Sequence, residues 1–187
     1  MQDIFVRIFR CLDGSEIIGA QNSLPEIILN HCKDYKIEYK YVESISAWNA
    51  LNDVVLKITN NSLTNENVTF SPRKKPLFND GYISLSHSNG VVAVCYSKNS
   101  CAIDIELVND NKNYTTLKKR LNLSNNVSNE EFFKEWTKIE AVSKLNDKFS
   151  TSLINNNVKT NTFPVNFYGK NYTVTIASNK EFNIKFI

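Results

Sequence analysis

The sequence predicts an α+β fold in which one chain forms two similar subdomains, related by a pseudo-two-fold axis, each a small antiparallel sheet packed with a long helix. Two observations support this prediction. Helical and strand-like hydrophobic patterns alternate along the chain. The same order of elements, a segment that contains a helix followed by three strand-like runs, also occurs twice. This order predicts an N-terminal subdomain over residues 1–100 and a C-terminal subdomain over residues 101–187.

The first half is expected to begin with a strand and to continue with two helices. Residues 3–9 are rich in β-branched and aromatic side chains, as strands are. Residues 22–32 predict a helix with Ser23 as its N-cap and Pro25 in its first turn. Apolar side chains recur at helical spacing through residues 44–60, which favours an amphipathic helix. Strand-like runs then follow at 67–70, 82–86, 91–96 and 101–107.

A turn signal defines the expected pairing of these runs. Asn89-Gly90 separates two of them, and Asn-Gly is a strong signal for a two-residue β-hairpin turn. The run at 101–107 follows closely along the chain. Residues 82–107 are therefore expected to form an antiparallel meander.

The second half repeats the order of elements. A short helix is expected over residues 113–121 and a long helix over residues 128–147. Ser128 and Glu131 form a capping box at the start of the long helix, where each side chain satisfies a backbone N–H group. Strands are expected after this helix, at 163–168, 171–178 and 181–187.

The composition is that of an ordinary globular protein, with 42% hydrophobic and 22% charged residues in a chain of 187. A net charge of +3 suits an anionic ligand but falls well short of a nucleic-acid-binding surface. The four cysteines include no C-x-x-C pair, which argues against structural zinc. No apolar run approaches the roughly 20 residues that cross a bilayer, and the N-terminus resembles a strand more than a signal segment. A cytoplasmic protein without nucleic-acid or membrane partners is therefore expected.

Two carboxylates share one face of the predicted strand at 101–107. Because side chains alternate across a strand, Asp104 and Glu106 point to one side while the isoleucines between and beside them point to the core. Mg²⁺ prefers oxygen ligands and usually takes one or two carboxylates together with substrate phosphates. The alternative is a half-buried strand whose acids face water.

The long helix presents a third acid. Trp136, Glu140 and Lys144 are four residues apart, so all three project from one side of the helix. The alternative is a core tryptophan beside a routine Glu–Lys pair, worth about 0.2–0.5 kcal/mol. Three gathered carboxylates, Asp104, Glu106 and Glu140, would repel one another and raise each other's pKa without a cation. Such a cluster favours a metal site.

A basic turn precedes a strand end rich in hydroxyl groups. Arg73, Lys74, Lys75 and Pro76 form the turn, and Ser86, His87 and Ser88 lie at the strand end. Charged groups, hydroxyl donors and backbone N–H groups of this kind can hold a phosphate. A solvated loop and an ordinary hairpin histidine are the alternative.

In this order, the four segments resemble the signature of the 4'-phosphopantetheinyl transferase superfamily, and most closely its Sfp-type branch. The family pattern is a Lys-Pro turn, a Ser-His-Ser strand end, a Gly-x-Asp-x-Glu strand and a Trp-[Ser/Thr]-x-Lys-Glu-[Ala/Ser]-x-x-Lys helix. Here these segments are Lys75-Pro76, 86–88, 102–106 and 136–144. The resemblance covers about residues 70–150.

The resemblance implies transfer of the 4'-phosphopantetheine group from coenzyme A to a serine of an apo acyl- or peptidyl-carrier protein, with release of adenosine 3',5'-bisphosphate. Asp104, Glu106 and Glu140 would bind Mg²⁺, or Mn²⁺ in its place, which holds the pyrophosphate of coenzyme A. Glu140, directly or through a water, would help to deprotonate the serine. Lys144 would contact the phosphate as the bond to the leaving group breaks.

The resemblance also implies a coenzyme A site in the N-terminal half. His87 would meet the 3'-phosphate, with Ser86 and Lys75 beside it, and Arg73, Lys74 and Pro76 would complete the basic turn. The carrier protein is expected to dock between the halves, against apolar residues such as Leu117, Leu121 and Phe133. A chain with two halves should complete its site alone, so a monomer is expected. The sequence does not indicate whether fatty-acid, polyketide or peptide synthesis is served.

Three departures from the family pattern keep other functions open. Ala102 replaces the glycine that opens the acidic strand, and Ile139 replaces the lysine before Glu140. Lys138 is rotated by about 100° from that position on a helix and cannot substitute for it. Lys33, Lys36 and Lys40 match the family's basic helix start by charge only. A catalytically weak or inactive member that binds coenzyme A or a carrier protein is the first alternative, and an α+β interaction domain with incidental acids is the second.

Overall fold

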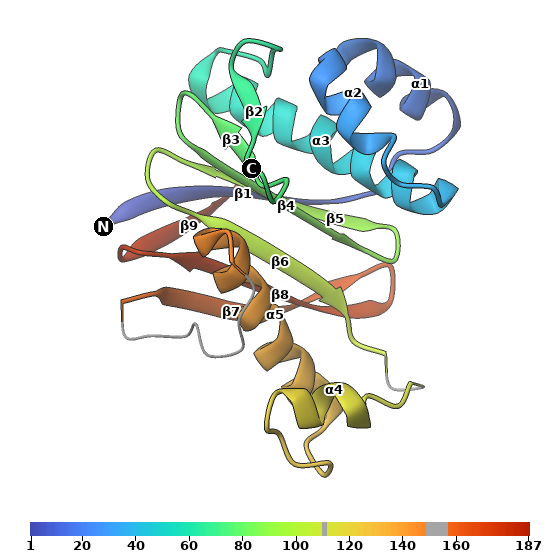
Figure 1. Cartoon of the computed structure of the whole chain (residues 1–187), viewed down its shortest axis with the longest axis vertical. Helices are drawn as coiled ribbons and strands as arrows, with labels where there is room; N and C mark the ends of the chain where they lie inside the picture. Colours follow the sequence, from blue (N-terminus) through green and yellow to red (C-terminus); the bar gives the residue numbers. More distant parts are fainter. Residues whose placement is uncertain (110–111, 149–156) are drawn as a thin grey trace.

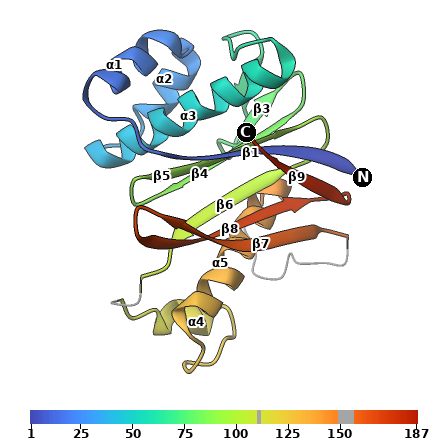
Figure 2. The ribbon, with the colours of Figure 1, turned by 180° about the vertical axis from the view of Figure 1, so that it is seen from behind.

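The computed structural model describes residues 1–109, 112–148 and 157–187, and within them the chain is α+β, as predicted. Five helices accompany three small sheets in which nearly all strand pairs are antiparallel. Figures 1 and 2 show the helices of the N-terminal part on one side of the molecule and the last two helices toward the opposite end.

The first sheet has the strand order β4-β5-β1-β9. Its strands are β1 (Gln2–Arg10), β4 (Tyr82–Ser88), β5 (Val91–Ser97) and β9 (Phe182–Phe186). Strands β4 and β5 form the predicted hairpin, and both turn residues adopt left-handed backbone, with φ of 48° at Asn89 and 83° at Gly90. Strand β9 pairs with β1 in parallel, so the last strand of the chain returns to the first sheet.

Three helices cover one face of the first sheet: α1 (Gly14–Ser23), α2 (Glu26–Cys32) and α3 (Glu38–Thr59). Helix α3 packs Trp48 and its apolar neighbours against Val92, Val94 and Tyr96 of β5. A two-stranded ribbon, β2 (Val68–Phe70) with β3 (Pro76–Phe78), follows α3.

The second sheet has the strand order β6-β8-β7. Its strands are β6 (Ala102–Leu107), β7 (Lys159–Phe167) and β8 (Lys170–Ser178). The helices α4 (Thr115–Arg120) and α5 (Asn129–Asn146) lie between β6 and β7 in the chain. Ile103 and Ile105 pack with Val91, Ala93 and Cys95 of the first sheet, so the two sheets share an apolar interior. Helix α5 packs on the opposite face of the second sheet, where Ala102 and Ala177 meet Ala141 and Val142.

The molecule therefore has four layers: helices α1–α3, the first sheet, the second sheet and helix α5. Side chains alternate along β6, so one set points to the first sheet and the other set points to helix α5. The isoleucines face the first sheet, and Asp104 and Glu106 lie on the side of α5. As predicted, Ile103 and Ile105 pack in the apolar interior, whereas Asp104, which is also buried, bonds to Ser86 and Lys144.

The structure corrects three expectations about individual elements. Residues 22–32 do not form one helix, because α1 ends at Ser23 and α2 begins after Pro25, which is its N-cap. Residues 82–107 do not form a meander, because β6 pairs with β8 instead of β5. Helix α3 begins at Glu38, six residues earlier than predicted, because polar residues of its first turns interrupt the apolar pattern without ending the helix.

Candidate functional site

Strands β4 and β6 belong to different sheets but lie side by side, and their contact over residues 84–88 and 103–107 is called the seam below. The edge of β6 that faces β4 has backbone N–H groups without a strand partner. Hydroxyl groups of β4 accept two of them: Ser84 Oγ from the Ile103 N–H and Ser88 Oγ from the Leu107 N–H, each at 3.2 Å. Serines at alternate positions of β4 thus join the two sheets.

The same row of serines holds the two carboxylates of β6. Ser86 Oγ donates to Asp104 Oδ1 and Ser88 Oγ donates to Glu106 Oε2, each at 2.8 Å. Asp104 is only 3% exposed, and its second oxygen, Oδ2, is buried without a hydrogen-bond partner. A buried carboxylate oxygen without a partner is costly, so it marks a position where a cation or a donor would be stabilised.

Helix α5 brings the third acid and the lysine to the seam. Its predicted capping box is present, with Ser128 Oγ accepting from the Glu131 N–H. The rotation of the helix is fixed by Thr137, whose fully buried hydroxyl bonds to the Thr175 hydroxyl of β8 at 2.8 Å. One turn further on, Glu140 is directed to the same side as Lys144.

Lys144 lies across the seam. Its Nζ donates to Asp104 Oδ1 at 2.7 Å, to the Ile103 carbonyl at 3.2 Å and to the Leu85 carbonyl at 3.4 Å. One ammonium group therefore contacts both strands and neutralises Asp104, the most buried of the three acids at this site.

The charge of Asp104 influences the ionisation of the two other acids. Burial, followed by the charge of Asp104 and, more weakly, that of Glu140, raises the pKa of Glu106 to about 7. Burial and then the charge of Asp104 also raise the pKa of Glu140. Asp104 thus raises the pKa of both other acids, while its own hydrogen bonds go to Ser86 and Lys144; the convergence of the three carboxylates on one cation stays a prediction.

The donor set suits a hard divalent cation in its chemistry. All three side chains offer carboxylate oxygens, one oxygen is buried without a partner, and two carboxyls have raised pKa values that a cation would reverse. Over residues 1–109, 112–148 and 157–187, however, no three acidic, histidine or cysteine side chains are already gathered around a metal-sized space. Lys144 holds the cationic position beside Asp104 in this arrangement.

The basic turn contacts the C-terminal end of α5. Arg73 donates from its guanidinium to the Asp147 carbonyl, and Lys75 Nζ donates to the Leu145 carbonyl at 2.8 Å. Cations are stabilised at this end of a helix, where carbonyl groups lack partners. Burial lowers the pKa of Lys75. Lys74, at a left-handed φ of 64°, pairs instead with Asp34 at 2.6 Å.

A pocket of about 370 Å³ lies between the basic turn and α5. Pro76, Tyr35 and Trp48 supply part of its wall, and Glu140 and Ser143 line it from the helix. Five lysine or arginine side chains and two acidic side chains line the pocket, so it favours an anion; the five cations are Arg73, Lys74, Lys75, Lys144 and Lys148. The Ser143 hydroxyl is buried without a partner at this wall.

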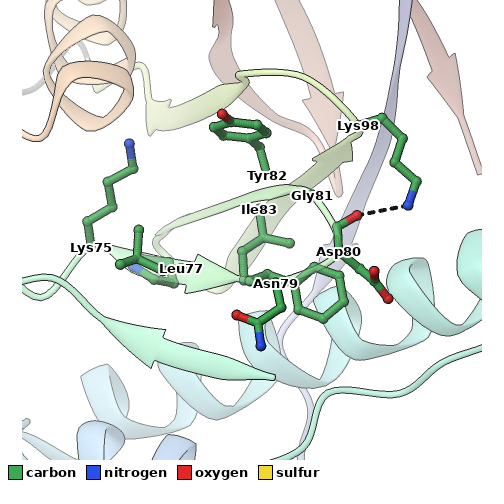
Figure 3. A pocket seen from close by; sticks show the side chains of 10 residues that line it. Lys75, Leu77, Asn79, Asp80, Gly81, Tyr82, Ile83 and Lys98 are labelled. Atoms are coloured by element: carbon green, nitrogen blue, oxygen red, sulfur yellow. Dashed lines mark hydrogen bonds between the residues drawn. The ribbon is translucent and has the colours of Figure 1, made fainter. Parts of the chain in front are cut away.

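Figure 3 shows a second hollow, of about 490 Å³, which Lys75 and Pro76 also line. Lys98 and Tyr82 line it, and Lys98 Nζ donates to the Asp80 carbonyl at 2.9 Å. None of the three seam acids lines this hollow. The 370 Å³ pocket, which Glu140 and Lys144 of α5 line together with Ser84 and Leu85 of the seam, is therefore the candidate binding site.

Two of the three residues predicted to dock an acceptor lie together. Leu117 and Phe133 line a hollow of about 240 Å³ with Trp136, and Glu106 reaches the same hollow. Leu121 is half-buried and does not line it. Phe133 is only 5% exposed and packs against Tyr114 and Phe132, so it offers little apolar surface to a partner; docking of an acceptor here stays a prediction.

Sequence reasoning missed a buried carboxylate that engages His87. Glu43 of α3 is 3% exposed, and its Oε2 lies 3.0 Å from His87 Nδ1. An acid directly before the apolar positions of the predicted helix at 44–60 was the available signal, because a charged residue is almost never fully buried unless it is paired. Ser86, in contrast, was expected beside a ligand phosphate, and its hydroxyl is directed to Asp104.

The departure at residue 139 has a structural reason. Ile139 is 6% exposed and belongs to the buried face of α5, so an ammonium group at its position would be costly.

No protein-family model matches this sequence, and no curated protein matches it. Among the residues that the structure describes, no helix combines the length and the apolar composition needed to cross a membrane. Function is therefore inferred from the site geometry.

Proposed function

We propose that the protein is a Mg²⁺-dependent 4'-phosphopantetheinyl transferase that modifies a serine of an acyl- or peptidyl-carrier protein. The observation that supports this most is the hydrogen bond from Lys144 of α5 to Asp104 of β6, beside a basic pocket that Lys144 and Glu140 line. Glu106 lies on the same face of β6, where the charge of Asp104 contributes to raising its pKa. The order of the four motif segments supports the same reaction. In this proposal the two sheets, each packed with one long helix, are the pseudo-two-fold halves of the Sfp-type branch.

The chemistry requires an attacking oxygen, a proton acceptor and charge neutralisation. The serine hydroxyl of the carrier protein attacks a phosphorus of the coenzyme A pyrophosphate; a new O–P bond forms, and the bond to adenosine 3',5'-bisphosphate breaks. When bound by the seam carboxylates, a divalent cation would neutralise charge on the pyrophosphate oxygens. The proton of the serine passes to Glu140, directly or through a water.

The surroundings of Glu140 suit a proton acceptor. Without a cation, burial and then the charge of Asp104 raise its pKa. A cation bound by the carboxylates would lower the pKa again and keep Glu140 ionised, so that it can accept the proton of the serine. Lys144, now paired with Asp104, reaches the same pocket and can donate to a phosphate oxygen once Asp104 binds a cation instead.

The direct test is the mass of the acceptor. Incubation of the protein with an apo carrier protein, coenzyme A and Mg²⁺ is expected to add one phosphopantetheine group to the acceptor serine, and EDTA is expected to prevent the addition. Glu140→Gln should lower the rate by about a hundredfold or more, since general-base catalysis contributes roughly 10²–10⁴-fold. Unmodified acceptors across several carrier proteins, with another transferase active in parallel, would contradict the proposal.

A second candidate is a family member that binds coenzyme A without transferring its arm. Two features of α5 favour this alternative. Lys144 is paired with Asp104, and Ile139 stands where the family has a lysine, so neither position offers a free cation to a phosphate. Calorimetry that shows tight coenzyme A binding without any acceptor modification would select it.

A further inference from the structure

A buried carboxylate of helix α3 holds two donors of the β4–β5 hairpin and one donor of its own helix. Glu43 Oε1 accepts from the Gly90 N–H at 2.9 Å, and Oε2 lies 3.0 Å from His87 Nδ1 and 3.1 Å from Lys40 Nζ. Burial alone would raise the pKa of Glu43, but the bonds from His87, Gly90 and Lys40 outweigh it and lower the pKa to about 2. Glu43 is therefore an ionised acceptor.

An ionised carboxylate can only accept hydrogen bonds, so it places a proton on His87 Nδ1. His87 Nε2 then becomes the nitrogen that can meet another group, and no described residue bonds to it. The ring is not sealed off, since its side chain keeps 12% exposure.

His87 lies next to the basic pocket. The ring of Tyr35 makes an edge contact with the imidazole, with centroids 6.1 Å apart, and Tyr35 lines the pocket with Lys74 and Lys75. The charged and titratable groups around the imidazole are thus Glu43 and Lys40 from α3 and Tyr35 from the segment before it.

We propose that Glu43 is the positioning residue for His87, fixing the tautomer in which Nε2 faces a phosphate monoester of the ligand and balancing the charge of the imidazole when it is protonated. The proposal rests on the proposed function, in which this phosphate is the 3'-phosphate of coenzyme A. A purely structural role, in which Glu43 only fastens Gly90 at the hairpin tip, is the competing explanation. The two explanations differ in one respect: only the positioning role predicts that a loss of binding in a Glu43 variant depends on the 3'-phosphate of the ligand.

The test compares coenzyme A with dephospho-coenzyme A, which lacks the 3'-phosphate, by calorimetry on the full chain with Mg²⁺ present. Glu43→Gln keeps an oxygen for the Gly90 N–H and removes the charge. We expect it to weaken coenzyme A binding by about tenfold, the scale of a hydrogen bond to a charged group, and to leave dephospho-coenzyme A binding unchanged. Glu38→Gln is the matched control, because it removes an exposed carboxylate from the first turn of the same helix and leaves the contact between Glu43 and His87; its selectivity should stay within about twofold of the natural protein's.

Equal losses for both ligands in Glu43→Gln would overturn the proposal, because a distorted hairpin does not distinguish them. A second measurement needs no coenzyme A: nitrogen NMR of the free protein should show neutral His87 protonated on Nδ1, and Glu43→Gln should make the two tautomers mix. A neutral His87 protonated on Nε2 would also overturn it. Failure of the natural protein to bind either form of coenzyme A would contradict the proposed function, while the NMR result would still decide the role of Glu43.

Discussion

Glu106 lies in surroundings that favour its protonated form. Burial is the largest cause, and the nearby charge of Asp104 adds to it. The serine hydroxyl of Ser88 and the ammonium of Lys144 act in the opposite direction but do not compensate. Such a carboxyl lowers the stability of the free protein at neutral pH and gains most from a bound cation, which is the pattern of a functional site.

This environment predicts a stabilising substitution. A carboxyl with a pKa of about 7 in the folded protein and an ordinary value of 4.5 in the unfolded chain costs nothing below pH 4.5. Between pH 4.5 and 7 the carboxyl lowers the free energy of unfolding increasingly, because the folded state binds the proton more tightly than the unfolded chain does. Above pH 7 this loss of stability is complete. Glu106→Gln should therefore raise the free energy of unfolding by roughly 2 kcal/mol at pH 8.

Urea unfolding at pH 8 and at pH 4.5, without metal, measures this effect. The gain should shrink to near zero at the lower pH, and Glu66→Gln, at an exposed position, should change little at either pH. A Glu106→Gln protein that is less stable than the natural protein at pH 8 would contradict the assignment.

Glu43 should behave in the opposite way. Its pKa of about 2 means that the folded protein favours the ionised form, so its contribution is complete above pH 4.5 and is lost as the pH falls toward 2. Glu43→Gln should lower the free energy of unfolding by about 2 kcal/mol at pH 7 and by little at pH 2.5. Thermal unfolding across this range checks the sign, and a pH-independent loss would show that the charge is not what stabilises the fold.

At the scale of elements, the seam is organised by hydroxyl groups. Ser84 accepts an N–H group of β6, Ser86 donates to Asp104, and Ser88 does both, so the alternate serines of β4 together join the sheets and place the acids. A threonine of α5 joins the helix to the second sheet, because the Thr137 hydroxyl bonds to Thr175 of β8, which also bonds to Thr162 of β7. These bonds hold α5 in one rotation about its axis relative to the second sheet.

This role of Thr137 gives a matched pair of variants. Thr137→Val keeps the shape and removes the hydroxyl, which leaves the buried Thr175 with one partner fewer and should cost about 1–2 kcal/mol of unfolding free energy. Thr137→Ser keeps the hydroxyl and should cost less than about 1 kcal/mol. The transfer rate should fall with the valine and not with the serine. Equal rates in both variants would show that the helix needs no such anchor.

Individual elements were largely predictable, because their signals are local. The strand at 3–9, the turn at Asn89-Gly90 and the capping box at Ser128 follow from neighbouring residues alone, and all are present. The pairing of β6 was not predictable in this way. Its partner β8 lies more than sixty residues further on, and nothing in residues 97–107 distinguishes a continued meander from a strand that joins another sheet.

The candidate site was predictable only in part, for the same reason. Spacing places Asp104 with Glu106 and Glu140 with Lys144, but the contact between the two pairs depends on how α5 packs on the second sheet. Glu43 and the contacts of Arg73 and Lys75 with the end of α5 could not be found from spacing, since their partners are 44 to 74 residues distant in the chain.

At the scale of the whole molecule, several contacts join the two sheets. Strand β9 returns from the C-terminal half to pair with β1, and the apolar interior is shared between the sheets. The basic turn of the first half also fastens the end of α5. The halves are therefore expected to depend on each other for stability.

This dependence predicts a single unfolding transition. In calorimetry, the measured enthalpy should equal the van't Hoff enthalpy, as in a cooperative two-state protein. Two separate transitions, each corresponding to about half of the chain, would contradict the prediction and would indicate two independent domains.

The central claim is that oxygens at Asp104, Glu106 and Glu140 form a cation site completed by the pyrophosphate of coenzyme A. The most direct measurement is titration calorimetry of coenzyme A with and without Mg²⁺, on the natural protein and on Asp104→Asn. We predict that Mg²⁺ tightens binding by at least about tenfold in the natural protein, or about 1.4 kcal/mol, and by less than twofold in the variant. Coenzyme A binding that is the same with and without Mg²⁺, or a full Mg²⁺ effect in Asp104→Asn, would contradict the claim.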